Sequence, residues 1–149
     1  MDEIDKNLLN AIQCDFPIVH RPYAVLGERF GLTEEETLTR VRGLVESGVI
    51  RRIGPSFDSR KLGYVSMLVA AKVPPDQLED VARIVSSYPQ VTHNYSRDHE
   101  YNLWFTLVCE GTDKLNRLLE EIKRSTGVRD MVCLPAKRVF KIKVDFELL

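Results

Sequence analysis

The sequence predicts an α+β protein with an N-terminal winged helix-turn-helix domain and a C-terminal ferredoxin-like domain. Two observations support this fold class. Three helical segments and one weakly alternating segment fill the first ~55 residues, which is the pattern of a helix-turn-helix unit with a short wing. Strands and amphipathic helices then follow one another in the order β-α-β-β-α-β. The polar stretch SFDSRKLG separates the two parts, so we expect domains at residues 1–60 and 61–149.

The first domain is expected to contain helices at 2–13, 23–31 and 34–48 and a wing strand at 49–58. The third helix has the clearest start and stop signals. Thr33 and Glu36 have the spacing of a capping box. Gly48 lies where a left-handed residue usually ends a helix.

The second domain is expected to contain strands at 63–73, 90–97 and 101–110, helices at 74–89 and 111–127, and one or two closing strands within 128–146. The strand at 63–73 is almost wholly apolar, and the helix at 74–89 begins with proline and has one apolar face. In a βαββαβ domain both helices cover the same face of the sheet. The other face stays open, so it is expected to meet a partner sheet or a ligand.

The composition is that of an ordinary globular protein, with 149 residues, 44% hydrophobic and 29% charged, and a formal net charge of -1. No run of 18 apolar residues is present, so we expect no membrane span. Cys14, Cys109 and Cys133 are widely spaced and form no CxxC pair. This pattern argues against a disulfide framework or a structural zinc site, and it fits a cytoplasmic protein.

The charge of the first domain argues against nucleic acid as a partner. Residues 1–52 hold nine acidic and seven basic side chains, whereas DNA binding requires Lys and Arg to meet phosphates. The N-terminal end of a recognition helix faces the bases. Here that end reads TEEET, so the carboxylates of Glu34, Glu35 and Glu36 would face the phosphates. Arg40 and Arg42 lie further along the helix.

Polar and aromatic side chains are concentrated in the predicted hairpin at 91–105, VTHNYSRDHEYNLWF. Strand periodicity places one set of alternating side chains on a shared face: Val91, His93, Tyr95 and Arg97. On the second strand it separates two sets, Tyr101, Leu103 and Phe105 from Asn102, Trp104 and Thr106. His99 lies at or beside the turn. A histidine and an arginine at alternating positions make a poor core stripe, so this face is interpreted as the wall of a polar site.

The residue types in this cluster suggest one class of ligand. Imidazole is a common metal ligand and a proton carrier near neutral pH. Guanidinium pairs with carboxylates through two parallel hydrogen bonds, and aromatic faces stack on flat rings. A large, flat, iron-bearing macrocycle with many carboxylates would use all three. Taken singly, each residue has a simpler explanation as a packing or solvated side chain.

The two-domain order resembles the Lrp/AsnC family of transcription regulators. The likeness rests on DEIDKNLLNAIQ, on LTEEETLTRVRGLVESGVIRRIG and on the later hairpin. In that family the first domain binds DNA, and the second dimerises and binds an effector near the hairpin. The resemblance leaves two regulatory alternatives open, a DNA-binding regulator and a tetrapyrrole-sensing one.

A narrower resemblance is carried by THNYSRDHEYNLWFTL and by GVIRRIGPSFDSRKLGY, which are similar to the hairpin and linker of the siroheme decarboxylases. This resemblance implies an enzyme of haem or d1-type haem synthesis. The enzyme removes CO2 from two acetate side chains of siroheme to give 12,18-didecarboxysiroheme. It also implies a pair of related subunits, and the sequence leaves a homodimer and a heterodimer both open. No cofactor is expected beyond the iron of the siroheme substrate.

The resemblance also implies roles for single residues. His93 and His99 are expected at the tetrapyrrole, with His99 as the iron ligand and His93 as the proton donor. Tyr95 and Arg97 are expected to position the acetate groups. The remaining hairpin residues expected to bind substrate are Tyr101, Asn102 and Trp104. The expected basic partners of the other carboxylates are Arg51, Arg52 and Lys61, with Arg60, Lys137, Arg138, Lys141 and Lys143 as further candidates. The simpler interpretation of the C-terminal lysines is a solvated edge strand.

Overall fold

A computed structural model of the chain describes residues 1–141, 146 and 148. They form two compact units, one containing Met1–Ser56 with the described residues of Lys141–Leu149, the other containing Phe57–Phe140. The domain boundary expected from the sequence instead places every residue after 60 in the second domain. The difference at the C-terminus is explained by Gln13, whose amide donates to the Phe146 carbonyl at 2.5 Å and accepts from the Phe146 N–H at 3.1 Å.

The first unit contains the three expected helices, α1 (Glu3–Cys14), α2 (Pro22–Glu28) and α3 (Glu34–Glu46). Its interior is formed by apolar side chains on the inward faces of the helices, Leu8, Leu26, Val41 and Leu44, and by Ile50 after the end of α3. The helices α2 and α3 approach closely at Gly27. A Cβ on this residue would lie 2.4 Å from the Thr37 hydroxyl oxygen, so a larger side chain cannot fit without moving α3.

The segment 49–58, expected to be a wing strand, forms no strand in the structure. Its apolar residues alternate only weakly, and a strand needs a neighbour for its backbone groups. No such neighbour pairs with it among the described residues. Pro55 also lacks an N–H to donate. Among the described residues, the first domain is therefore a helix-turn-helix without a wing strand.

The expected capping box of α3 is present: Thr33 Oγ1 accepts from the Glu36 N–H at 3.2 Å, and Glu36 Oε2 accepts from the Thr33 N–H at 2.8 Å. These bonds to Thr33 lower the pKa of Glu36 from its ordinary value of 4.5. We expect Thr33→Ala to reduce the free energy of unfolding by about 1 kcal/mol at neutral pH. Because the folded-state pKa is depressed, Glu36's contribution is present above pH 4.5 and is lost as the pH falls through the lowered pKa.

Urea unfolding at about pH 7 and about pH 3.5 measures both effects, because the deficit of the variant should shrink in acid. Thr39→Ala is the matched control. Thr39 is exposed in the middle of the same helix, where alanine is the better helix former. A Thr33→Ala chain as stable as the wild type at neutral pH would show that the cap contributes nothing.

The second unit has the expected βαββαβ order. Its elements are β1 (Tyr64–Ala71), α4 (Leu78–Ser86), β2 (Val91–Ser96), β3 (Leu103–Glu110), α5 (Thr112–Thr126) and β4 (Met131–Pro135). Short 3₁₀ turns, Ser59–Leu62 and Pro75–Gln77, precede β1 and α4. The strands form one antiparallel sheet in the order β2-β3-β1-β4, which confirms the ferredoxin-like prediction. Of the two possible closing strands, β4 is present. The described residues 136–141 form no strand, and Lys143 lies outside the described residues.

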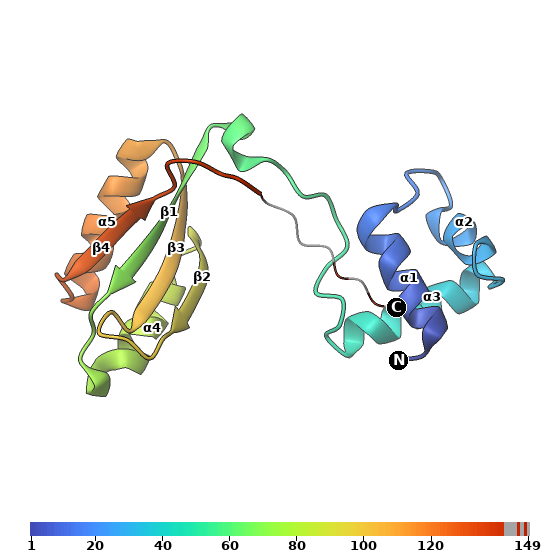
Figure 1. The fold of residues 1–149 in the computed structure, drawn as a ribbon, viewed down its shortest axis with the longest axis horizontal. Coiled ribbons are helices and arrows are strands. Elements are labelled where there is room, and N and C mark those ends of the chain that lie inside the picture. Colours follow the sequence, from blue (N-terminus) through green and yellow to red (C-terminus); the bar gives the residue numbers. More distant parts are fainter. Residues whose placement is uncertain (142–145, 147, 149) are drawn as a thin grey trace. The chain divides into compact units, whose positions relative to one another are not determined.

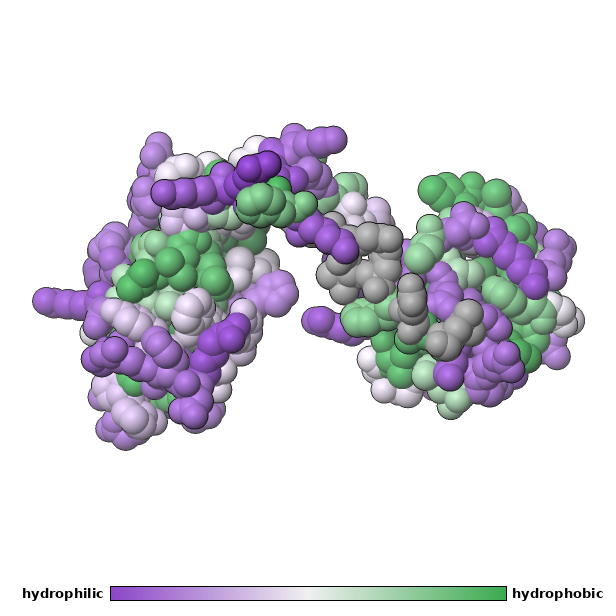
Figure 2. Space-filling view, in the orientation of Figure 1, coloured by the Kyte–Doolittle hydropathy of each residue, from purple (hydrophilic) through white to green (hydrophobic). Residues whose placement is uncertain are grey.

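Both helices cover the same face of this sheet (Figure 1). The covered face contains the core, in which Val69 of β1, Phe105 and Leu107 of β3 and Ile122 of α5 are fully buried. The opposite face is open. Figure 2 shows a hydrophobic patch on it over β1 and β4, where Val132 and Leu134 are 38% and 41% exposed.

Candidate functional site

The hairpin of β2 and β3 presents one row of polar and aromatic side chains on the open face of the sheet. His93 pairs with Thr106 and Tyr95 pairs with Trp104, and these four side chains share that face. Val91, expected on the same face, pairs instead with Leu107 of the core. A register shift between Val91 and His93 explains this error, because an inserted residue reverses which face the following side chains take.

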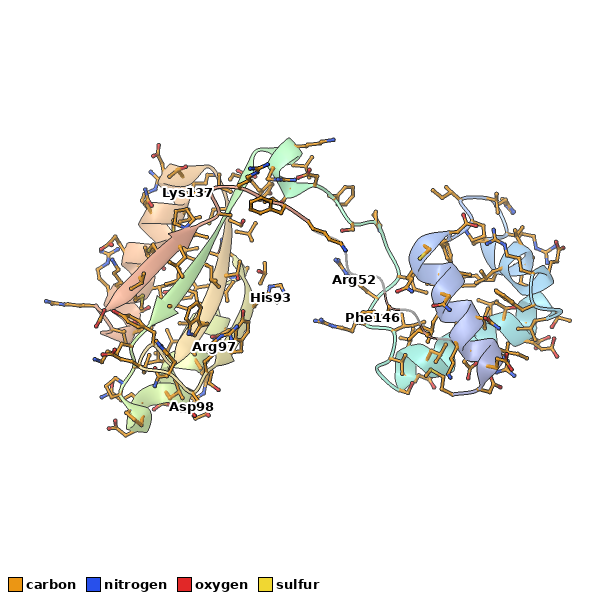
Figure 3. The ribbon with its side chains drawn as sticks, in the orientation of Figure 1. Arg52, His93, Arg97, Asp98, Lys137 and Phe146 are labelled. Atoms are coloured by element: carbon orange, nitrogen blue, oxygen red, sulfur yellow. The ribbon has the colours of Figure 1, made fainter. Side chains whose placement is uncertain are left out.

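Arg97 lies just beyond β2, over the rings of both aromatic residues. Its guanidinium carbon is 5.1 Å from the centroid of Tyr95 and 5.2 Å from that of Trp104. Figure 3 shows Arg97 and Asp98 towards the hairpin turn and His93 further along β2. Within the part of the chain that the structure describes, no carboxylate pairs with Arg97. Its hydrogen-bond donors are therefore available to a ligand carboxylate, while the rings restrict where the group can lie.

His99 is oriented by its neighbour Tyr101. The two rings stack with their centroids 6.3 Å apart and an interplanar angle of 24°. The Tyr101 backbone N–H donates to His99 Nδ1 at 3.1 Å. Because Nδ1 accepts a hydrogen bond, the proton of the neutral ring lies on Nε2. His99 therefore presents a hydrogen-bond donor at Nε2.

His93 has the opposite capability. Its Nδ1 lies 3.0 Å from the hydroxyl oxygen of Thr92. A hydroxyl oxygen can accept a hydrogen bond from Nδ1–H, and in that tautomer the lone pair of Nε2 is free. Metal-bound histidines show this arrangement, with one nitrogen on the metal and the other donating to an oxygen. Thr92 could not be predicted as the partner of His93, because the bulge between Val91 and His93 leaves no signal in the alternation of side chains.

Asn102 does not offer its amide to a ligand, contrary to the expectation that it binds substrate. Its Nδ2 donates to the Val73 carbonyl at 2.9 Å, and its Oδ1 accepts from the Val73 N–H at 3.0 Å. Trp104 likewise uses its ring N–H, which donates to the Tyr101 carbonyl at 2.7 Å. The face of the Trp104 ring remains available for stacking, whereas the Asn102 amide is occupied inside the fold.

Two further contacts attach the tip of the hairpin to the sheet. The Tyr101 hydroxyl donates to Asp130 at 3.1 Å, and this hydrogen bond raises the pKa of Tyr101. Lys72 and Glu100 form an exposed ion pair, which raises the pKa of Lys72 and lowers that of Glu100. These partners could not be predicted from local sequence, because residues 72 and 130 are distant from the hairpin along the chain.

The expected basic partners outside the hairpin are exposed. Arg51 and Arg52 belong to the first unit, and Lys61 lies in the 3₁₀ turn before β1. Arg60 is paired with Asp58 at 3.1 Å. The roles of Arg51, Arg52 and Lys61 stay predictions.

Several charged groups of the helix-turn-helix unit are paired with one another. Arg40 of α3 binds Asp2 at 2.9 Å and Asp5 at 2.8 Å. Glu34 pairs with Arg21. Arg40 and Arg42 are the two arginines on the predicted recognition helix that could meet phosphates. Of these, Arg40 is already paired with the carboxylates of Asp5 in α1 and Asp2 at its N-cap.

Among the described residues, no helix is long and apolar enough to cross a bilayer. No group of three or more His, Cys, Asp or Glu side chains gathers in the same part of the chain as a metal site.

Comparisons with known proteins identify the family. Residues 61–141 match the family model of the AsnC-like ligand binding domain, and residues 5–51 match that of the siroheme decarboxylase NirDL-like helix-turn-helix domain. The siroheme decarboxylase alpha subunit of Nitratidesulfovibrio vulgaris is 51% identical over 99% of this chain and 84% of its own length. The alpha subunit of Desulfovibrio desulfuricans is 49% identical over 99% and 85%.

A solved structure agrees. The siroheme decarboxylase NirDL in complex with an iron-uroporphyrin III analogue is 37% identical to this chain, with a TM-score of 0.72, over 96% of this chain. The chain spans about half the length of that protein, 47%. The two structural units match the two family models, and the similarity to the alpha subunits extends over nearly the whole chain. The chain therefore belongs to the siroheme decarboxylase family.

Proposed function

We propose that this chain is a siroheme decarboxylase subunit that removes CO2 from two acetate side chains of siroheme to give 12,18-didecarboxysiroheme. The observation that carries the proposal is the grouping of Arg97, two aromatic rings and two histidines around the open-face hairpin. Arg97 provides a cation free to bind a carboxylate, and Tyr95 and Trp104 provide flat faces. The NirDL structure with an iron-uroporphyrin III analogue supports an iron tetrapyrrole as the ligand class.

The proposed reaction needs no redox partner. The bond between the acetate methylene and its carboxylate breaks, CO2 leaves, and its electron pair stays on the methylene carbon next to the conjugated ring. One proton then converts that carbon into a methyl group. The balance is one carboxylate and one proton consumed for each CO2 and methyl group formed, so we propose that no cofactor beyond the iron of the substrate takes part.

The hydrogen bonds favour roles for the two histidines opposite to those expected from the resemblance. His99 holds its proton on Nε2 in the neutral ring, and a protonated nitrogen cannot coordinate iron. His93 can keep Nε2 free by donating Nδ1–H to Thr92. We therefore assign the substrate iron to His93, and we assign to His99 the hydrogen bond that orients an acetate or its incoming proton.

Arg97 must not bind the reacting carboxylate too strongly, because catalysis depends on binding the transition state more tightly than the substrate. A guanidinium that bound the reacting carboxylate strongly would oppose the loss of CO2. We therefore propose that Arg97 holds a neighbouring carboxylate and so fixes the macrocycle. The reacting acetate then points towards the histidines, where its carboxylate leaves as CO2.

A related subunit is the proposed partner. The hairpin side chains lie on a surface, with Tyr95 41% exposed, so they form one wall of a site and a second wall must come from elsewhere. The exposed apolar residues Val132 and Leu134, on the same face of the sheet, favour another sheet as that wall. NirDL has about twice the length of this chain, which fits two such units working together. Free cysteines fit a cytoplasmic location.

The test is anaerobic incubation of the purified chain with siroheme, alone and with a co-expressed related subunit, followed by mass spectrometry. Loss of two CO2 units is the expected result. A shifted absorption spectrum without loss of mass, even with the second subunit, would instead support a tetrapyrrole-sensing regulator. If neither binding nor turnover occurs, the proposal fails, and promoter DNA becomes the ligand to test.

A further inference from the structure

The side-chain amide of Asn102 takes the place of a peptide group in the sheet. Strands β1 and β3 pair up to Ala71 and Leu103. Two more residues in the same antiparallel register would pair Val73 with Tyr101. Instead, the Val73 N–H and carbonyl both bind the amide of Asn102. The Lys72 N–H turns the other way, to the Asp130 carbonyl at 3.0 Å.

This substitution leaves the backbone of Tyr101 free for other partners. Its N–H donates to His99 Nδ1 at 3.1 Å, and its carbonyl accepts from the Trp104 ring at 2.7 Å. In a continued ladder both groups would be bound to Val73. The contact that sets the tautomer of His99 and the contact that orients Trp104 therefore both depend on Asn102.

Asn102 also reaches Arg97 through its own backbone. The Asn102 carbonyl accepts from the Arg97 N–H at 2.9 Å, which closes the hairpin turn. The Arg97 carbonyl in turn accepts from the His99 N–H at 3.0 Å. One residue is thus bound by its side chain to Val73, just after β1, and by its main chain to the start of the turn.

We propose that Asn102 is a positioning residue that holds His99 with its proton on Nε2 and fixes Trp104 beneath Arg97. The role of Asn102 in catalysis rests on the proposed function. Its control of His99 and Trp104 does not, because the amide acts through the Tyr101 backbone and not on the substrate. The sequence expectation that Asn102 contacts the substrate is replaced by this role.

The first test reads the tautomer of His99 without substrate. The full chain, labelled with 15N-histidine, is examined by two-dimensional NMR at about pH 8.5, where an unperturbed imidazole is neutral. We expect the His99 signals of the wild type to show the proton on Nε2 and those of Asn102→Ala to show a mixture of tautomers. Glu100→Gln is the matched control. It removes an exposed ion pair at the same hairpin tip and should leave the His99 signals unchanged.

The second test reads turnover with the related subunit present, at a temperature where all variants are folded. We expect Asn102→Ala to lower kcat by about 10- to 100-fold, the scale of a misplaced catalytic group, with KM within about threefold. Glu100→Gln should stay within about twofold. In a His99→Gln background, Asn102→Ala should lower kcat by a much smaller factor than it does in the wild type, because the effects of residues that act as a unit are not additive.

The inference is overturned if Asn102→Ala keeps the Nε2–H tautomer of His99, or if its cost in kcat is unchanged in the His99→Gln background. The remaining outcome, a wild-type chain that does not decarboxylate siroheme, removes the proposed function. The NMR comparison then still decides whether Asn102 controls His99. Asn102→Asp guards against a folding artefact, because at the same pH its carboxylate can still accept from the Val73 N–H but cannot donate to the Val73 carbonyl. Its His99 signals should therefore lie between those of the wild type and those of Asn102→Ala.

Discussion

Arg97→Ala is expected to lower kcat/KM for siroheme decarboxylation by about 10- to 100-fold. A hydrogen bond to a charged group contributes about 1.5–3 kcal/mol, and each 1.36 kcal/mol corresponds to a factor of ten in rate. Arg97 lies over two aromatic rings. Its position is therefore limited before the ligand arrives, and little conformational entropy is lost on binding. We attribute the effect to the lost contact with a substrate carboxylate.

Steady-state kinetics of three variants separate charge from geometry at this position. Arg97→Lys keeps the charge but lacks the planar fork that binds a carboxylate through two hydrogen bonds, so it should lose less than the alanine variant. Arg83→Ala is the control. Arg83 is exposed on α4 and paired with Asp80, and that helix covers the other face of the sheet. If Arg97→Ala stays within about twofold of the wild type, Arg97 does not bind the substrate.

Replacing His93 by glutamine is expected to remove a ligand from the iron of bound siroheme. The absorption bands of the complex should shift towards those of free siroheme. Affinity should fall by about 10-fold or more, since even supporting groups of a metal site contribute that much. His99→Gln should leave the spectrum of the complex close to that of the wild type and lower kcat. This difference follows from the partners of the two rings, Thr92 for His93 and the Tyr101 backbone for His99.

Anaerobic titration of each variant with siroheme, followed by absorbance, measures the effect on binding. His20→Gln is a suitable control because His20 is exposed in the loop between α1 and α2. The assignment would be reversed by a His99→Gln complex that loses the spectral shift while His93→Gln keeps it. Such a result would mean that the hydrogen bond from Tyr101 to His99 breaks when the substrate binds.

The order of elements and the grouping of polar and aromatic side chains on the hairpin could be read from local sequence. The apolar positions of α3 repeat at helical spacing, and Thr33 with Glu36 marks its start, so neighbouring residues alone determine that helix. The βαββαβ order followed in the same way from strand alternation and helix signals. The cluster from His93 to Trp104 was visible because uncommon residue types occur close together in the chain.

Other features could not be predicted without the tertiary structure. Val91 was assigned to the wrong face because a bulge reverses the alternation and has no composition of its own. The segment 49–58 was expected to be a strand, although pairing depends on a neighbour that local alternation cannot supply. The place of Phe146 beside Gln13 depends on hydrogen bonds between residues 133 positions apart.

The sequence by itself determined the two-domain α+β architecture and the chemical types gathered at the hairpin, since periodicity and residue type are local properties. Only the tertiary structure decided which hydrogen bonds orient those side chains. It places the Val73 backbone against Asn102 and so leaves Tyr101 free to bind His99 and Trp104. The physical reason is that a buried backbone group must find a hydrogen-bond partner, and the partner it finds depends on which distant segments the fold brings together.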